Sequence, residues 1–270
     1  MPILTINQKF LAAPAPDSGA APSDAVTRVA EMFGIGLDET FEVALYDRLP
    51  LDVRPGDVVY ITGPSGGGKS VLLRLIEDAL RASGAGPLVN LAAVDLPDGP
   101  RAIDLMQSSL DESLRLLSAA GLADPLALLR PARELSEGQR YRLRLAVAIK
   151  QTDCGLRNAD CGTNCTAYQA PAVAVHSALR APHFALSSRN PQFAVLLADE
   201  FCSMLDRRCA RALAYRVQRL TRARGITLLA ATAHDDLLED LAPDVLVVKH
   251  EGPRVEVTYA DPAREGDDRA

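Results

Sequence analysis

A run of glycines around one lysine constrains this chain more than any other stretch of its sequence. The run consists of Gly63, Pro64, Ser65, Gly66, Gly67, Gly68, Lys69 and Ser70. Glycines allow positive φ angles, so that successive backbone N–H groups can surround phosphate oxygens. At this spacing Lys69 is expected to reach the β and γ phosphates, and the Ser70 hydroxyl to ligate Mg²⁺. The run therefore fits the Walker A pattern of a phosphate-binding loop.

The residues on either side place this loop between a strand and a helix. Asp57–Thr62 is a short β-branched run, typical of a buried strand. From Val71 to Arg81 the apolar residues recur at helical spacing, and Gly84 is the expected end of the helix. Val71 is counted with the loop among the nucleotide-binding residues. A helix N-terminus that faces the phosphates is what the mechanism requires, so a glycine-rich turn without a ligand is the less favoured alternative.

Two further apolar strands end in polar residues that suit the same site. The run Pro191–Ala198 leads into Asp199 and Glu200, and the run Ile226–Ala231 leads toward His234. The carboxyl ends of parallel strands meet at one edge of an α/β sheet, where sites form. There Asp199 can hold Mg²⁺, Glu200 can orient an attacking water, and His234 can contact the γ phosphate. Solvated acids and a histidine without a chemical role are the structural alternatives.

The remaining periodicity predicts one α/β domain with additions. Further strands are expected within residues 2–10, 40–53 (two strands), 88–94, 245–249 and 254–259. Helices are expected over 24–33, over 101–130 with interruptions at Gly121 and at Asp124–Pro125, and over 207–224. We divide the chain into an N-terminal arm with a short helix (1–39), a nucleotide-binding domain (40–260) and a charged tail (261–270). Within the domain we expect a helical subdomain at about 101–150 and a cysteine-containing insertion at about 151–190.

Composition excludes several classes of protein. A net charge of −6 over 270 residues argues against a generally basic nucleic-acid coat, but it leaves room for a local basic patch. No apolar run approaches the roughly 20 residues of a membrane span, and the first residues lack the pattern of a secretion signal. We therefore expect a cytoplasmic protein. Five cysteines, an odd number, argue against a disulfide framework.

A predicted helix start follows the helical subdomain. Ser136 and Gln139 have the spacing of a capping box, so a helix is expected to begin here with free N–H groups and the Ser136 hydroxyl pointing outward. Such an end favours an anion. Capped helices are common, so this signal gains its meaning only from the other motifs.

Taken together, these motifs resemble the ATPases of the ABC superfamily. The resemblance rests on the Walker A loop at 63–70, a signature-like Leu135–Gln139, a Walker B strand at 195–200, a D-loop-like Ser203–Asp206 and the switch-histidine position at His234. The motifs occur in the family's order and span about residues 40–250. This order is far more specific than any single motif.

The resemblance implies a fold, an activity and a partner. The fold would be a P-loop NTPase of ABC type, with a mainly parallel core sheet, flanking helices, a small antiparallel β part and a short helical subdomain. The protein would hydrolyse ATP with Mg²⁺, and Glu200 and His234 would be its catalytic residues. Two copies would dimerise head to tail through ATP, with Ser136 and Gly138 facing the γ phosphate bound by the other subunit. Asp206 would line the dimer interface.

Several departures from the pattern of transporter ATPases suggest a branch without a transport function. No residue clearly fills the place of the glutamine that helps couple transporters to a membrane partner; Gln107 is the nearest, and it falls within a predicted helix. The interval from Lys69 to Ser136 is short, and no proline or threonine follows Asp199–Glu200 at the usual place. Residues 198–207 and 233–237 are similar to little-characterised ABC-type ATPases fused to a predicted acetyltransferase domain. An acetyltransferase-like partner would then be a separate chain.

Three functions remain open from the sequence. The first is an ATPase that closes as a homodimer and drives a conformational change in a protein or nucleic-acid partner, without a membrane partner. The alternative is the ATP-binding subunit of a membrane ABC transporter. The third is a nucleotide-sensing scaffold that does not hydrolyse ATP.

Two smaller sites also remain open. The insertion contains three cysteines and two histidines, namely Cys154, Cys161, Cys165, His176 and His183. Three thiols and an imidazole suit tetrahedral Zn²⁺, but their spacing matches no zinc ribbon or finger, so reduced cysteines in a surface loop are favoured. Phe41 or Tyr46 is a candidate for stacking on adenine, and both are equally candidates for the core.

Overall fold

Helices and strands alternate along most of the chain, as is typical of α/β proteins. The computed structural model describes residues 3–12, 23–34, 41–84, 86–157, 194–234 and 236–261. The strands are β1 (Ile3–Ala12), β2 (Phe41–Asp52), β3 (Val58–Thr62), β4 (Leu88–Asn90), β5 (Ala194–Ala198), β6 (Ile226–Ala231), β7 (Val245–Lys249) and β8 (Val255–Tyr259). The α-helices are α1 (Asp24–Phe33), α2 (Lys69–Ala82), α3 (Leu110–Ala119), α4 (Pro125–Leu128), α5 (Glu137–Arg157), α6 (Arg207–Ala223) and α7 (Leu238–Leu241).

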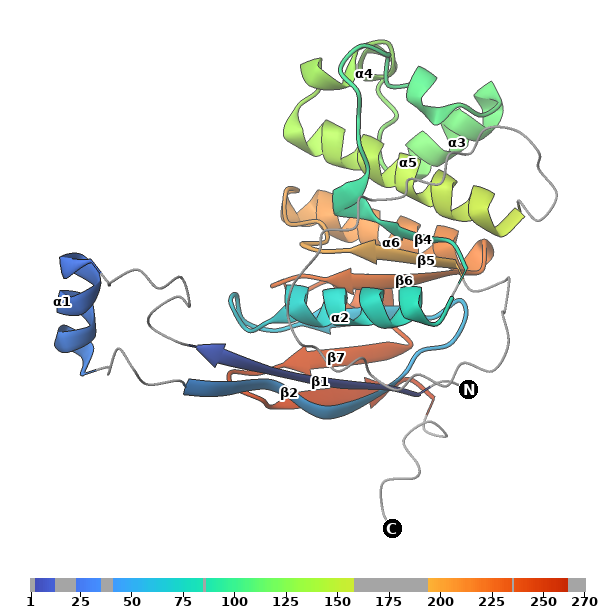
Figure 1. Cartoon of the computed structure of the whole chain (residues 1–270). Helices are drawn as coiled ribbons and strands as arrows, with labels where there is room; N and C mark the ends of the chain where they lie inside the picture. Colours follow the sequence, from blue (N-terminus) through green and yellow to red (C-terminus); the bar gives the residue numbers. More distant parts are fainter. Residues whose placement is uncertain are drawn as a thin grey trace.

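The central sheet has six strands in the order β4-β5-β6-β3-β7-β8 (Figure 1). Strands β4, β5, β6, β3 and β7 run parallel to one another, and β8 pairs antiparallel with β7. A second, two-stranded antiparallel sheet is formed by β1 and β2. The predicted mainly parallel sheet with a small antiparallel part is therefore confirmed. Because β5, β6 and β3 are neighbours and parallel, the loops that follow them lie at one edge.

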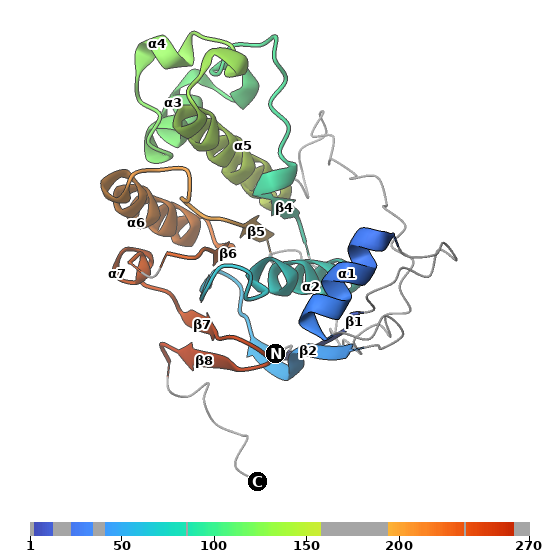
Figure 2. The ribbon, with the colours of Figure 1, turned by 90° about the vertical axis from the view of Figure 1, so that its left-hand side faces the viewer.

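Each face of the central sheet has its own hydrophobic core, because successive strand residues point to opposite sides. In β3, Val58 and Tyr60 face a core shared with α3, α5 and α6, whereas Val59 and Ile61 face a core shared with α2 and β2. Figure 2 shows α2 on one side of the sheet and α5 and α6 on the other. Helices on both faces explain why β3, β5 and β6 are buried along their whole length.

The helices α3, α4 and α5 form a layer that begins on the face of the sheet, where α5 packs against β5, and extends beyond the β4 edge (Figure 1). Arg224, just past α6, ties this layer to the sheet's helices with ion pairs of 2.5 Å to Glu112 of α3 and to Asp153 of α5. The predicted helical stretch over residues 101–130 is interrupted between α3 and α4, as expected from Gly121 and Asp124–Pro125, but it is not helical before α3. Residues 101–106 instead form a bridge from Arg101 to Pro131 and a short 3-10 turn.

The structure differs from expectation in the strand before Asp52 and in the length of the helix that follows Ser136. Residues 41–52 form one strand, not two, because β1 pairs with β2 along its length and register shifts near Gln8 absorb the irregularity. Helix α5 continues through Arg157, so the first residues of the predicted insertion, 151–157, are helical. The rest of the predicted insertion lies outside the described residues.

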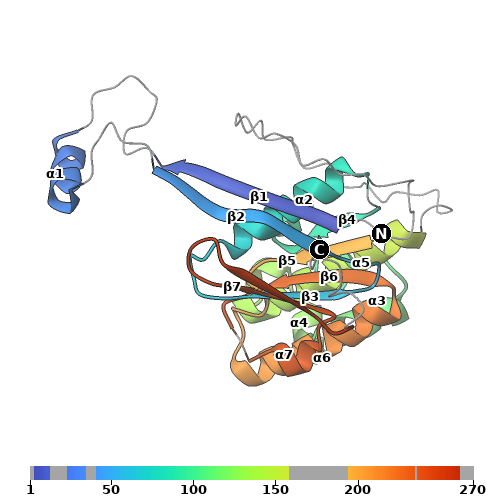
Figure 3. The ribbon, with the colours of Figure 1, turned by 90° about the horizontal axis from the view of Figure 1, so that it is seen from below.

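The helix predicted over Asp24–Phe33 is present as α1, with Ser23 as its N-cap and Gly34 in the left-handed conformation after it. It lies beyond the ends of β1 and β2, away from the central sheet (Figure 3). Within the ranges that the structure describes, none of the helices combines the length and the apolar character needed to cross a membrane.

Candidate nucleotide-binding site

The phosphate loop is a tight turn between β3 and α2. The N–H of Gly67 donates to the carbonyl of Pro64 at 3.2 Å, and Gly63, Gly66 and Gly68 have φ angles of 142°, 76° and 98°. These angles favour glycine. At Gly63 space also demands glycine, because an added Cβ would lie 2.1 Å from the carbonyl oxygen of Lys249. The loop is thus pressed against the end of β7.

The amine of Lys69 lies within the loop, where it donates to the carbonyls of Gly63 at 2.8 Å and Pro64 at 2.7 Å. Burial lowers the pKa of Lys69, and the nearby carboxylate of Asp199 partly opposes this shift. No side chain caps the N-terminus of α2 at Gly68, so the first N–H groups of this helix stay available to an anion. The loop and helix together have the features of a phosphate site.

Two carboxylates, those of Asp199 and Glu200, follow β5 in a turn with a strained backbone. The N–H of Glu200 donates to Asp199 Oδ1 at 3.0 Å, and Glu200 and Cys202 have φ angles of 49° and 62°. Positive φ at such residues costs about 1–3 kcal/mol and persists where the surroundings enforce it. Here the Ser203 hydroxyl donates to the carbonyl of Glu200 at 2.8 Å, and the N–H of Phe201 donates to Ala231 at 2.8 Å. Glu200 itself is exposed.

Helix α5, which begins in the signature-like segment, contacts the turn after β5. The buried N–H of Cys202 donates to the hydroxyl of Tyr141 on α5 at 2.9 Å. Burial raises the pKa of the Cys202 thiol to about 12 and raises that of Tyr141 well above its ordinary value. Both groups are therefore neutral at physiological pH. They couple α5 to the strand that carries the two acids.

The predicted capping box is present at the start of α5. The N–H of Ser136 donates to Gln139 Oε1 at 3.1 Å, and the N–H of Gln139 donates to Ser136 Oγ at 3.3 Å. Ser136 is exposed. A Cβ at Gly138 would lie 3.3 Å from Leu205 Cδ2, so this glycine allows close packing against the loop after β5.

Asp206 begins α6 and acts as its N-cap, accepting a hydrogen bond from the N–H of Cys209 at 3.0 Å. Hydrogen bonds from the side chain and then the backbone of Cys209 lower the pKa of Asp206. The carboxylate is exposed, and its lowered pKa keeps it charged at neutral pH while it caps the helix. Whether it also lines a dimer interface remains a prediction.

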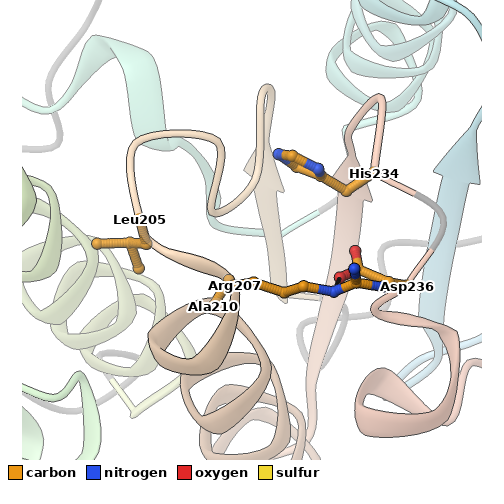
Figure 4. Close-up of a pocket in the computed structure, with 5 residues that line it drawn as sticks. All are labelled: Leu205, Arg207, Ala210, His234 and Asp236. Atoms are coloured by element: carbon orange, nitrogen blue, oxygen red, sulfur yellow. Dashed lines mark ion pairs between the residues drawn. The ribbon is translucent and has the colours of Figure 1, made fainter.

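His234 lies at the same sheet edge, on the loop after β6. Its carbonyl accepts hydrogen bonds from the hydroxyls of Tyr60 and Thr62, the latter at 3.2 Å. Its ring is exposed and extends over a cavity of about 290 Å³, and across this cavity Arg207 reaches Asp236 at 2.5 Å (Figure 4). The ion pair joins the start of α6 to the loop that carries His234.

Ser70 and Asp199 offer a hydroxyl and a carboxylate, the hard oxygen ligands that Mg²⁺ prefers, while phosphate oxygens and water usually complete its octahedron. No cluster of three metal-ligating side chains occurs among the residues that the structure describes. Of the candidate zinc ligands only Cys154 lies within the described residues; Cys161, Cys165, His176 and His183 lie outside them.

Of the two roles considered for Tyr46, the structure places it in the core and not where it could stack on adenine. It is fully buried, and its hydroxyl donates to the carbonyl of Gly68 at 2.9 Å. The side chain of Phe41 is outside the described part of the structure. Gln107 is not within an α-helix as predicted; it follows a short 3-10 turn, is exposed and has a φ of 45°.

Sequence reasoning missed Lys249, which lies buried beneath the phosphate loop. The available signal was a charged residue at the end of the apolar run Val245–Val248. Such a lysine is usually taken as the solvated end of a strand, so its burial was not predictable from local pattern.

The sequence of this chain is similar to those of several known proteins. No protein-family profile matches the chain. It is 35% identical over 111 residues to the cytochrome c biogenesis ATP-binding export protein CcmA of Novosphingobium aromaticivorans, covering 38% of this chain and 56% of that protein. It is 28% identical over 209 residues to the methionine import ATP-binding protein MetN of Xylella fastidiosa, covering 77% and 59%. It is 24% identical over 278 residues to the phosphonates import ATP-binding protein PhnC of Hyphomonas neptunium, covering 89% and 88%.

Solved structures show the same fold. The dimeric structure of a bacterial ABC transporter cassette matches with a TM-score of 0.52 and 15% identity, over 94% of this chain and 97% of that one. A post-hydrolysis state of the same cassette, bound to ADP and Pi, matches with a TM-score of 0.53. The fold is therefore that of an ABC-type ATPase, as expected. The chain spans only 56% and 59% of the lengths of CcmA and MetN.

The buried thiol of Cys202 provides a test of the turn after β5. With a pKa of about 12, almost no thiolate forms at pH 8, so we expect alkylation by iodoacetamide roughly 100-fold slower in the folded protein than in urea. Mass spectrometry of the peptide containing Cys202 measures this rate, and the urea-unfolded protein is the matched control. Equal rates in both states would contradict the packing of this turn against Tyr141.

Proposed function

We propose that this chain is an ATPase of the ABC type, which binds ATP between two copies of itself and hydrolyses it. One observation carries the proposal: the phosphate loop, the Asp199–Glu200 turn and the His234 loop follow three neighbouring parallel strands at one sheet edge. Phosphates, their metal and an attacking water need such groups close together. The relatives named as ATP-binding proteins support the same function.

Each group in the site has a proposed task. Lys69 and the N–H groups at the start of α2 bind the β and γ phosphates. Mg²⁺, held by Ser70 and Asp199, would neutralise phosphate charge when bound. Glu200, exposed at the same edge, orients the attacking water, and His234 contacts the γ phosphate. The strained backbone at Glu200 holds its carboxylate toward solvent at the sheet edge.

The proposed site is completed by a second copy of the chain. Ser136 is exposed at the N-terminus of α5, where the N–H groups that the capping box does not use favour an anion. In a head-to-tail dimer this end, together with Gly138, covers the γ phosphate bound by the partner, and Asp206 lies near the interface. The dimeric state of the similar solved cassette supports this arrangement.

Substitution of Lys69 tests the binding step. Lys69→Ala removes the cation from the loop, so we expect ATP affinity to fall roughly 100-fold, as for a charge-assisted contact of about 3 kcal/mol. Titration with a fluorescent ATP analogue measures the change. Arg74→Ala, which removes a cation from the exposed face of the same helix, is the control and should bind as the unmodified chain does. Unchanged affinity in Lys69→Ala would refute the phosphate-loop assignment.

Substitution of Glu200 tests the chemical step. Glu200→Gln keeps the size of the side chain but cannot accept a proton from water, so phosphate release should slow roughly 100-fold or more while ATP still binds. Because hydrolysis no longer opens the dimer, size-exclusion chromatography with ATP should show a stable dimer. Glu239→Gln, whose side chain is 89% exposed on α7, is the matched control. Normal turnover in Glu200→Gln would remove Glu200 from the mechanism, and no turnover in the unmodified chain would favour a sensing scaffold.

Two kinds of partner are proposed for the work that ATP drives. The departures from the transporter pattern favour a protein or nucleic-acid partner, including an acetyltransferase-like chain. The names of the relatives, which are import and export ATP-binding proteins, favour the ATP-binding subunit of a membrane transporter. The expectation that no membrane partner is involved therefore finds no support in the comparisons.

Purification of the ATP-trapped Glu200→Gln dimer from detergent-solubilised cells separates these two functions. We expect a partner to be retained, because trapping prevents the release that follows hydrolysis. Recovery of a protein with several membrane spans would identify a transporter subunit. Recovery of a protein without spans, or of nuclease-sensitive nucleic acid, would identify the first function. Phosphate release measured with and without added DNA or RNA then tests whether nucleic acid is an effector.

A further inference from the structure

A buried lysine lies directly beneath the phosphate loop. Lys249, the last residue of β7, has no exposed surface. Its amine donates hydrogen bonds to the carbonyls of His250, at 2.8 Å, and Gly252, and it lies 5.4 Å from the centre of the Tyr46 ring. Within the part of the chain that the structure describes, no carboxylate forms an ion pair with it. Burying a charge with only carbonyls and a ring as partners is costly, so a compensating role is expected.

Lys249 and Tyr46 touch the loop at three places. The carbonyl of Lys249 leaves room only for hydrogen at Gly63, as described above. A Cβ at Gly67 would lie 3.6 Å from Cγ of Lys249, so the aliphatic part of the side chain runs under the middle of the loop. At the far end, the hydroxyl of Tyr46 donates to the carbonyl of Gly68 at 2.9 Å.

The Gly68 carbonyl accepts two hydrogen bonds, from the Tyr46 hydroxyl and from the N–H of Leu72 in α2 at 3.0 Å, and together they fix the direction of the next N–H. In a planar trans peptide, the C=O of one residue and the N–H of the next point in opposite directions. Holding the Gly68 carbonyl toward Tyr46 and the first turn of α2 therefore points the N–H of Lys69 away from both of them. The cation of Lys249 against the Tyr46 ring in turn restricts the position of this ring, since desolvated cation–π contacts are strong.

We propose that Lys249 is a positioning residue of the nucleotide site, which acts through Tyr46 to hold the peptide between Gly68 and Lys69 in its phosphate-binding orientation. The inference rests on the proposed ATP site and adds to it a pair of side chains from β7 and β2 that do not touch the nucleotide. Burial lowers the pKa of Lys249 and raises that of Tyr46, in keeping with an enclosed pair.

A double-mutant cycle tests this chain of contacts. Lys249→Met keeps the aliphatic length without the charge, and Tyr46→Phe keeps the ring without the hydroxyl. Each should weaken binding of a fluorescent ATP analogue roughly 10-fold, the scale of a desolvated cation–π contact or a buried hydrogen bond. Both substitutions break the same chain of contacts from Lys249 through Tyr46 to Gly68. The double variant should therefore bind the ATP analogue about as tightly as whichever single variant has the lower affinity. KM for ATP should rise while kcat at saturating ATP stays within about two-fold, as expected for lost ground-state binding.

The controls separate this inference from the proposed function. Arg254→Met removes a cation, 72% exposed, from the same β7–β8 turn and should bind ATP normally. If the unmodified chain does not bind ATP, the proposed function fails. If it binds, and Lys69→Ala weakens binding while Lys249→Met and Tyr46→Phe do not, only this inference fails. Losses that multiply in the double variant would also overturn it. Should Lys249→Met not fold, as judged by circular dichroism, unchanged affinity in the conservative Tyr46→Phe variant suffices to reject it.

Discussion

The close approach of Gly63 to the end of β7 is the constraint on which the site depends. Only hydrogen fits between this residue and the carbonyl of Lys249, and a φ of 142° is open to glycine alone at no cost. The contact fixes where the chain leaves β3 and therefore where the phosphate loop begins. With this point fixed, the turn from Pro64 to Gly67 and the start of α2 follow from local hydrogen bonds.

The parallel sheet then brings the other groups to the loop. Since β5, β6 and β3 are adjacent and run in one direction, the residues that follow them share an edge. Backbone hydrogen bonds join these exits, from Phe201 to Ala231 and from Thr232 to Ile61. The turn at Glu200 carries strain that its neighbours maintain, as is common where stability is traded for the placement of a reactive group.

The site on one chain is open on one side. The capped end of α5 and the carboxylate of Glu200 are both exposed, and Tyr141 links them through the backbone of Cys202. The Arg207–Asp236 pair similarly joins the start of α6 to the loop of His234. These contacts join the turn after β5 to α5, and the start of α6 to the loop that carries His234.

Much of this protein was determined by local sequence. The phosphate loop, the α/β class, the capping box at Ser136 and the helix over Asp24–Phe33 follow from spacing and backbone preference within a few residues, which act in the same way in any fold. The tertiary structure alone decided the burial of Tyr46 and Lys249, the single strand β2 and the Arg207–Asp236 pair. Each of these depends on which distant segments pair or pack, and no local pattern records that choice. From local sequence, a lysine at the end of an apolar strand is expected to be solvated. Lys249 is buried because the phosphate loop, which follows a different strand, covers it.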